Sequence, residues 1–163
     1  MQCTPGSGDD FEARARELLE AGEDYFVEGF IATWLTAHAI IPGTQPFATL
    51  ALAVGAADRY ADGLYPFRPI IWMNRGDAVA ARAAKAVLGE GDDLHTANGT
   101  PVVASEAFPV GELYITGAVR VVRSPIVTFG AVATTTNEEW GVAEAAWAAG
   151  FDCLPPAKFD FTA

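Results

Sequence analysis

The stretch at residues 111–153 constrains the fold most, because it carries a dense β signal in a chain of 163 residues. Short runs of β-branched and aromatic residues follow one another there, and such residues favour strands. The runs lie at 113–115, 118–119, 121–122 and 126–129. Gly117, Ser124-Pro125 and Gly130 separate them. The pattern predicts several short strands, and the stretch contains neither a nucleophile–base pair nor a cluster of metal ligands.

The order of residues here is distinctive. A strand ending Leu-Tyr-x-Thr-Gly is followed by Val-Arg-Val-x-Arg-Ser, then by Asn, by Ala-Glu and by a closing Gly-aromatic-Asp-Cys. This order resembles the carboxy-terminal part of the major capsid proteins of tailed bacteriophages, most closely those of phages that infect actinobacteria. The family usually has Arg directly after Ala-Glu, where this chain has Ala145, so an ion pair made by that Arg cannot be carried over. The matching positions are Tyr114, Thr116, Gly117, Val119, Arg120, Val121, Arg123, Ser124, Asn137, Ala143, Glu144, Gly150, Phe151, Asp152 and Cys153.

The resemblance implies an α+β chain with the tailed-phage capsid fold, in which a long spine helix joins a β-rich peripheral domain to an α/β axial domain. It implies a spine-helix region at 1–35, an axial-type domain at 36–110 and a C-terminal β segment of the peripheral domain at 111–163. The implied function is structural rather than enzymatic. The chain would be a capsid subunit of a phage or prophage that self-assembles into an icosahedral shell around DNA, as part of a virion assembled in the host cytoplasm.

The implied partners are copies of the chain or a longer capsid protein, with scaffold and portal proteins, and no specific nucleic-acid sequence or membrane. Arg120 and Arg123 interrupt the apolar run at 118–123. On a strand they would point to opposite faces, so only a bulge would let them form one anion site. They either discourage edge-to-edge aggregation or make salt bridges across subunit boundaries. The candidate interface residues are Arg120, Arg123, Glu144, Asp152, Tyr25 and Glu28.

The amino-terminal part has the strongest helical pattern. Asp9 followed by Glu12 is a variant of the capping box. Gly22 and Gly29 weaken the pattern, so we expect a kink or an end near Gly29. In the capsid family the spine helix lies at this point and follows a Cys, which Cys3 matches. Apolar residues recur every three or four positions and predict one apolar face, formed by Phe11, Ala15, Leu18, Gly22, Tyr25, Phe26 and Phe30.

Further elements are expected between these two regions. A helix at 47–61 would bury Leu50, Val54, Ala57 and Tyr60 or Ala61. A wholly apolar strand follows at 70–73, and Asp77 would cap a third helix that runs to about Leu88. A loop at 89–93 and an Asn-Gly turn at 98–99 precede a strand at 102–104.

The segment at 138–149 gives two conflicting signals. Alanine and glutamate dominate it and favour a helix, whereas the resemblance places a strand at 142–149. We follow the resemblance and expect alternate residues to point to opposite faces. The aromatic residues Trp140, Trp147, Tyr114 and Phe129 are either core residues or interface anchors, and we expect core.

Composition excludes some functions. Because the chain is 51% hydrophobic, we expect a packed globular body. Because its net charge is -11, we do not expect the basic stripe of a nucleic-acid-binding protein. The first ten residues lack the pattern of a signal peptide, and the longest apolar stretch is too short for a bilayer span. Cys3 and Cys153 are expected to be reduced thiols that could pair only if the termini meet.

Two other functions stay open. The first is a shell subunit of an encapsulin-like nanocompartment, which shares the coat fold. The second is a small acidic α+β hydrolase in which His95 acts as a base beside Asp92 or Asp93. Because a loop histidine next to acidic residues is more often solvated, we expect no catalytic residue, no cofactor and no metal.

The chain has no counterpart, before Cys3, of the amino-terminal arm and extended loop that family members carry. The sequence is therefore expected to be a fragment or processed product of a coat protein, a short subunit completed by another polypeptide, or a short paralogue.

Overall fold

The computed structural model describes residues 8–63, 69–133, 135, 138–152 and 155–162. The chain is mixed α+β, with 37% helix and 32% strand, as its sequence predicts. The helices are α1 (Gly8–His38), α2 (Leu50–Gly63) and α3 (Arg75–Ala83). The strands are β1 (Ile70–Met73), β2 (Val87–Leu88), β3 (Leu94–Thr96), β4 (Pro101–Ala104), β5 (Glu112–Thr116), β6 (Val119–Arg123), β7 (Val127–Ala133), β8 (Glu138–Glu144), β9 (Trp147–Phe151) and β10 (Ala157–Asp160).

The chain divides into two compact units. The first unit combines Met1–Val27 with Val121–Ala148, and the second combines Glu28–Arg120 with Ala149–Ala163. This division differs from the three consecutive segments expected at 1–35, 36–110 and 111–163. The reason is strand pairing: β5 and β10 lie in the last of those segments, yet both belong to the sheet of the second unit. Helix α1 contributes residues to both units.

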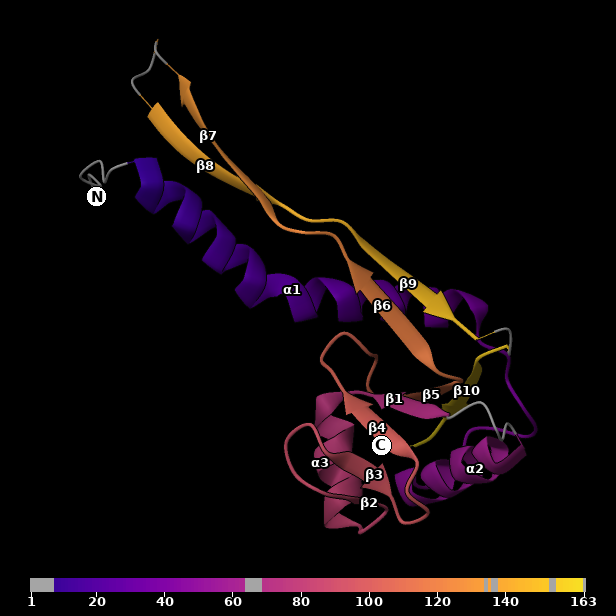
Figure 1. Ribbon diagram of the computed structural model, residues 1–163. Coiled ribbons are helices and arrows are strands. Elements are labelled where there is room, and N and C mark those ends of the chain that lie inside the picture. The colour runs from indigo at the N-terminus through magenta and orange to yellow at the C-terminus, as the bar shows by residue number, and fades with distance from the viewer. Residues whose placement is uncertain (1–7, 64–68, 134, 136–137, 153–154, 163) are drawn as a thin grey trace. The chain divides into compact units, whose positions relative to one another are not determined.

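The second unit is built on a six-stranded mixed sheet in the order β10-β5-β1-β4-β3-β2. Figure 1 labels all six strands. Strands β1 and β4 pair in parallel, and the other neighbours pair antiparallel. The turn between β3 and β4 holds Asn98-Gly99, as the sequence predicts, and Gly99 has a φ of 88°. That conformation suits glycine.

One face of this sheet carries the main core. Ile71 and Met73 of β1 pair with Ile115 and Leu113 of β5, and all four are fully buried. Helix α2 packs on β5 and β10 with its buried residues Ala53, Val54, Ala57 and Ala61. The expected strand at 70–73 is confirmed, and the expected helix at 47–61 is confirmed with a later start at Leu50.

The prediction for the third helix was wrong at both ends. The side chain of Asn74, not Asp77, caps α3 by accepting a hydrogen bond from the Gly76 amide at 2.8 Å. Asp77 is buried and accepts a hydrogen bond from the Gly111 amide at 3.0 Å. The helix ends at Ala83 because Lys85 has a φ of 58°, and the chain then enters β2.

The expected end of the first helix near Gly29 was also wrong, because α1 continues to His38. The last part of α1 packs in the second unit through Ile31, Ala32 and Leu35, which are almost completely buried. Burial of three apolar side chains outweighs the roughly 1 kcal/mol that a glycine costs in a helix.

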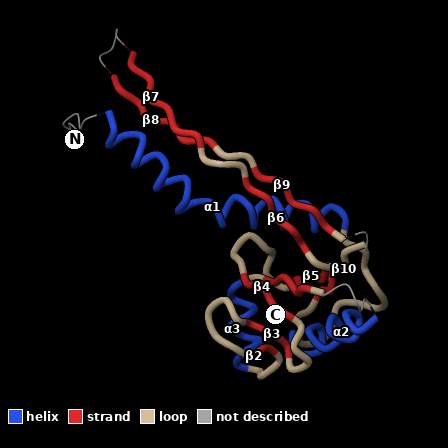
Figure 2. The backbone as a smooth tube through the Cα atoms, viewed as in Figure 1, coloured by secondary structure: helices blue, strands red, loops and turns tan. Residues whose placement is uncertain are grey.

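The first unit contains a long hairpin beside the amino-terminal part of α1 (Figures 1 and 2). Strands β7 and β8 pair antiparallel, with Phe129 opposite Val142 and Gly130 opposite Gly141. The strand expected at 142–149 is therefore confirmed in part: β8 ends at Glu144, residues 145–146 lie outside a strand, and β9 then pairs with β6. A Cβ atom at Gly141 would lie 2.3 Å from the Phe11 carbonyl oxygen, so a glycine permits α1 to approach the hairpin.

Candidate interaction surface

In the first unit, most of the large apolar side chains that the structure describes are exposed. Every fully buried hydrophobic residue in the described chain belongs to the second unit. In the first unit, by contrast, the expected apolar face of α1 is largely exposed. Leu18 is 68% exposed, Tyr25 71% and Phe26 57%. A monomer seldom leaves so much apolar surface uncovered, and such a surface marks a site of interaction.

The hairpin presents one such surface, which we call the outer hairpin face. Helix α1 lies against the face of Gly130 and Gly141, and the side chains of a strand alternate between faces. The register then places the outer residues together on the side away from α1, where Val127, Phe129 and Trp140 are exposed. The outer hairpin face consists of Val127, Phe129, Trp140, Val142 and Glu144.

Helix α1 presents the second surface, which we call the α1 stripe. Its residues follow at steps of four, three and four, so they share one side of a helix. All four are exposed. The ring of Phe26 supports that of Tyr25 in an edge-to-face contact, with ring centroids 5.8 Å apart. The α1 stripe consists of Arg14, Leu18, Ala21 and Tyr25.

The four aromatic residues expected in the core differ in how far they are buried. Tyr114 is fully buried, as predicted. Phe129 and Trp140 are 43% and 54% exposed, so the core interpretation was wrong for them. Trp147 is half-buried and donates its indole N–H to Glu23 at 2.8 Å.

Glu23 ties α1 to the strands of the first unit. Besides Trp147, it accepts a hydrogen bond from Arg123 Nη1 at 2.5 Å. The hydrogen bond from Trp147 lowers the pKa of Glu23, and Arg123 lowers it further against an opposing effect of desolvation. Arg123, expected at a subunit interface, thus has a partner within its own unit.

The other candidate interface residues do not form one cluster, and they differ in exposure and in hydrogen-bond partners. Arg120 and Glu144 are exposed. Glu28 accepts a hydrogen bond from the buried Ser105 hydroxyl at 2.5 Å, and Asp152 accepts one from the Ala118 amide at 2.9 Å. Of the six candidates, Tyr25 and Glu144 therefore belong to the exposed surfaces of the first unit, on the α1 stripe and the outer hairpin face. Asn137, Cys3 and Cys153 lie outside the described residues.

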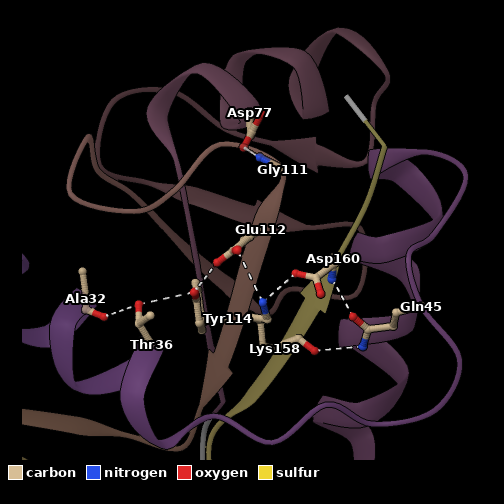
Figure 3. A network of polar contacts seen from close by, with 9 residues as sticks. All are labelled: Ala32, Thr36, Gln45, Asp77, Gly111, Glu112, Tyr114, Lys158 and Asp160. Carbon is tan, nitrogen blue, oxygen red and sulfur yellow. Dashed lines mark hydrogen bonds and ion pairs between the residues drawn. The ribbon is translucent and has the colours of Figure 1, made fainter.

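The richest polar cluster lies in the second unit, around β5 and β10 (Figure 3). Lys158 Nζ contacts Asp160 at 2.9 Å and Glu112 at 3.3 Å. The Tyr114 hydroxyl donates to Glu112, and Thr36 of α1 lies 3.4 Å from that hydroxyl. Sequence reasoning missed this cluster, because its members are scattered along the chain and only strand pairing brings them together.

The cluster behaves as a structural clamp. Burial raises the pKa of Tyr114, and the bond to Glu112 raises it further, so the phenol stays protonated and donates. Burial lowers the pKa of Lys158, but Asp160 and Glu112 outweigh that effect and the pKa is raised on balance. Gln45 completes the clamp by accepting from the Asp160 amide at 2.6 Å and donating to the Lys158 carbonyl at 2.9 Å.

A second polar cluster surrounds Asp58 of α2. This buried carboxylate accepts hydrogen bonds from Thr96 at 2.8 Å, Asn98 at 2.8 Å and Thr100 at 2.6 Å. An open depression of about 640 Å³ lies beside these residues, lined in part by Asp62, Asn98 and Thr100. The side chains of Asn98 and Thr100 are already bonded to Asp58, so the cluster fixes the β3–β4 turn on α2.

The proposed hydrolase residues are not assembled into a catalytic pair. His95 is half-buried on β3, whereas Asp92 and Asp93 are exposed. No hydrogen bond or ion pair joins His95 to either aspartate across the described loop from Leu88 to Pro101. Groups of three or more residues able to hold a metal ion are absent from the described part of the chain. Likewise, no described helix is both long and apolar enough to cross a bilayer.

The chain matches no protein-family model and no curated protein.

Proposed function

We propose that the chain is a structural subunit of the icosahedral capsid of a tailed phage or prophage, and that it self-assembles into a shell around DNA. The observation that carries the proposal is the ordered sequence match from Gly111 to Cys153, which follows a long amino-terminal helix. In this proposal the protein is part of the virion and is assembled in the host cytoplasm. Its partners are copies of itself or a longer capsid protein, with scaffold and portal proteins.

The uncovered apolar surface of the first unit supports a role in assembly. A two-stranded hairpin is marginally stable in water by itself, and the described part of the first unit adds only one helix to its strands. Burial against neighbouring subunits would stabilise this unit through the hydrophobic effect. Symmetric shells repeat one such surface many times and need complementary shape and charge rather than a reactive group.

The net charge of -11 is compatible with a shell that encloses DNA without binding it. An acidic inner surface repels phosphates, so packaged DNA would not adhere to it.

Co-assembly tests the proposal. The purified, fluorescently labelled chain is mixed with a full-length coat protein of an actinobacteriophage and its scaffold, and particles are separated by sedimentation and viewed by negative-stain microscopy. We expect the chain in the particle fraction, and we expect an unrelated acidic protein of similar mass to stay outside it. Exclusion of the chain from particles, together with failure to form particles alone, would contradict the proposal.

A further inference from the structure

We infer that the α1 stripe of one copy docks on the outer hairpin face of a second copy. The contact joins two unlike surfaces of the first unit, head to tail. The inference rests on the proposed function, and it assigns the surface through which neighbouring subunits associate.

One side of the hairpin has no cover among the residues that the structure describes. Helix α1 covers the face of Gly130 and Gly141, while Val127, Phe129 and Trp140 on the other face are exposed. Sheets that carry apolar side chains on both faces are normally packed on both faces. A second α1 helix on the outer hairpin face would complete a helix–sheet–helix arrangement.

The two surfaces match in length and in order. Arg14 and Tyr25 of the α1 stripe lie about 16 Å apart along a helix. Glu144 and Trp140 of the outer hairpin face lie about 13 Å apart along a strand. With Glu144 beside Arg14, the ring of Phe129 reaches Leu18 and that of Trp140 reaches Tyr25. The acidic end of one surface then meets the basic end of the other. The apolar residues of the two surfaces pack together along the rest of the contact.

Charge favours the α1 stripe of a second copy as the partner of the outer hairpin face, over a symmetric contact between two hairpins. The outer hairpin face ends in the exposed Glu144, so a symmetric contact between two such faces would bring like charges together. The α1 stripe carries Arg14 and no acidic residue. A head-to-tail contact also propagates from copy to copy, and it closes into rings when the rotation permits.

Two variants at exposed positions test the assignment. One carries Leu18→Lys and Tyr25→Lys and has an intact outer hairpin face. The other carries Val127→Lys and Phe129→Lys and has an intact α1 stripe. The control Glu20→Lys changes an exposed residue on another side of α1 and alters the net charge by the same amount. Circular dichroism confirms that each variant keeps the helix and strand content.

We expect each double variant to associate at least about tenfold more weakly than the parent chain in sedimentation velocity, as substitution of central interface residues does. Glu20→Lys should associate like the parent. An equimolar mixture of the two double variants should form dimers, because one intact α1 stripe meets one intact outer hairpin face. Monomers in the mixture, or full association of either double variant alone, would overturn the assignment.

Disulfide trapping gives an independent result if a lysine variant fails to fold. In chains with Cys3 and Cys153 replaced by serine, Tyr25→Cys and Trp140→Cys are made separately. Oxidation of the mixture should give a covalent dimer, and oxidation of either variant alone should not. A dimer from one variant alone, or none from the mixture, would overturn the assignment.

These outcomes separate the inference from the proposed function. If the parent chain enters particles but the two variants do not complement each other, the surface assignment fails and the capsid role stands. If the parent chain neither associates nor enters particles, both fail.

Discussion

At the scale of single residues, Gly141 marks the closest approach between α1 and the β7–β8 hairpin. A Cβ atom there would lie 2.3 Å from the Phe11 carbonyl oxygen, and backbone cannot move aside as a side chain can. A Cβ atom at its cross-strand partner Gly130 would lie 3.3 Å from the carboxylate of Glu12 and 3.9 Å from the Trp140 carbonyl oxygen, which is an ordinary contact. A side chain added at Gly141 would therefore clash with backbone, whereas one added at Gly130 would meet a movable side chain.

We predict that Gly141→Ala destabilises the first unit by about 2 kcal/mol, because overpacking against fixed backbone forces a displacement. Gly130→Ala should change stability by less than about 0.5 kcal/mol, because the flexible Glu12 side chain can move. Hydrogen exchange of the β7–β8 amides measures both effects. Equal exchange rates in the two variants would show that α1 does not pack closely on Gly141.

Glu23 makes a second prediction at this scale. Its pKa in the folded chain is lower than its ordinary value of 4.5, chiefly through the hydrogen bond from Trp147. A carboxylate with a depressed pKa stabilises the folded state above its unfolded pKa and loses that contribution as the pH falls through the folded value. We therefore expect Glu23→Gln to flatten the loss of stability below about pH 4.5.

Thermal unfolding between pH 3 and 6 measures this slope, with the exposed Glu20→Gln as the control. The control should keep the slope of the parent chain. An unchanged slope in Glu23→Gln would mean that the carboxylate has no stabilising partner in the folded state.

At the scale of elements, Asp58 fixes the β3–β4 turn on α2 through three side-chain hydrogen bonds. We predict that Asp58→Ala destabilises the second unit by about 3 kcal/mol, because it leaves the buried Thr96 hydroxyl without its acceptor and removes two further bonds to a charged group. Asp62→Ala, an exposed position on the same helix, should cost less than about 0.5 kcal/mol. Urea denaturation compares the two, and similar midpoints would contradict this role for Asp58.

The sequence predicts some elements well, for physical reasons. Strand β1 is a continuous apolar run suited to burial on both faces, and α2 has a regular apolar period, so both were placed correctly. The end of α1 was missed because its packing through Ile31 and Leu35 outweighs the cost of Gly29. Asp77 was taken for a helix cap because the true cap, Asn74, directly follows a strand and the buried partner of Asp77 lies far along the chain.

The surfaces of the first unit were harder to predict. Periodicity shows that Leu18 and Tyr25 share one side of α1, but it does not show whether another segment covers them. Strand alternation in the same way places Phe129 and Trp140 on one face without showing that the face is exposed. The polar clamp around Lys158 also needed the pairing of β5 with β10, which no local pattern encodes.

At the scale of the whole molecule, the buried core and the exposed apolar residues are distributed unequally. The second unit holds the fully buried hydrophobic residues of the described chain, and the first unit holds the α1 stripe and the outer hairpin face. A chain that is 51% hydrophobic and leaves one unit largely uncovered is suited to assembly. This distribution is the physical basis for the proposed capsid role.

The mass of the purified chain in solution tests that role most directly. The monomer has a mass of 17.2 kDa. Light scattering over a rising series of protein concentrations should give masses that grow to multiples of this value, and negative-stain images of the same samples should contain rings or closed particles. A mass that stays at 17.2 kDa at every concentration, alone and with a full-length coat protein present, would contradict it.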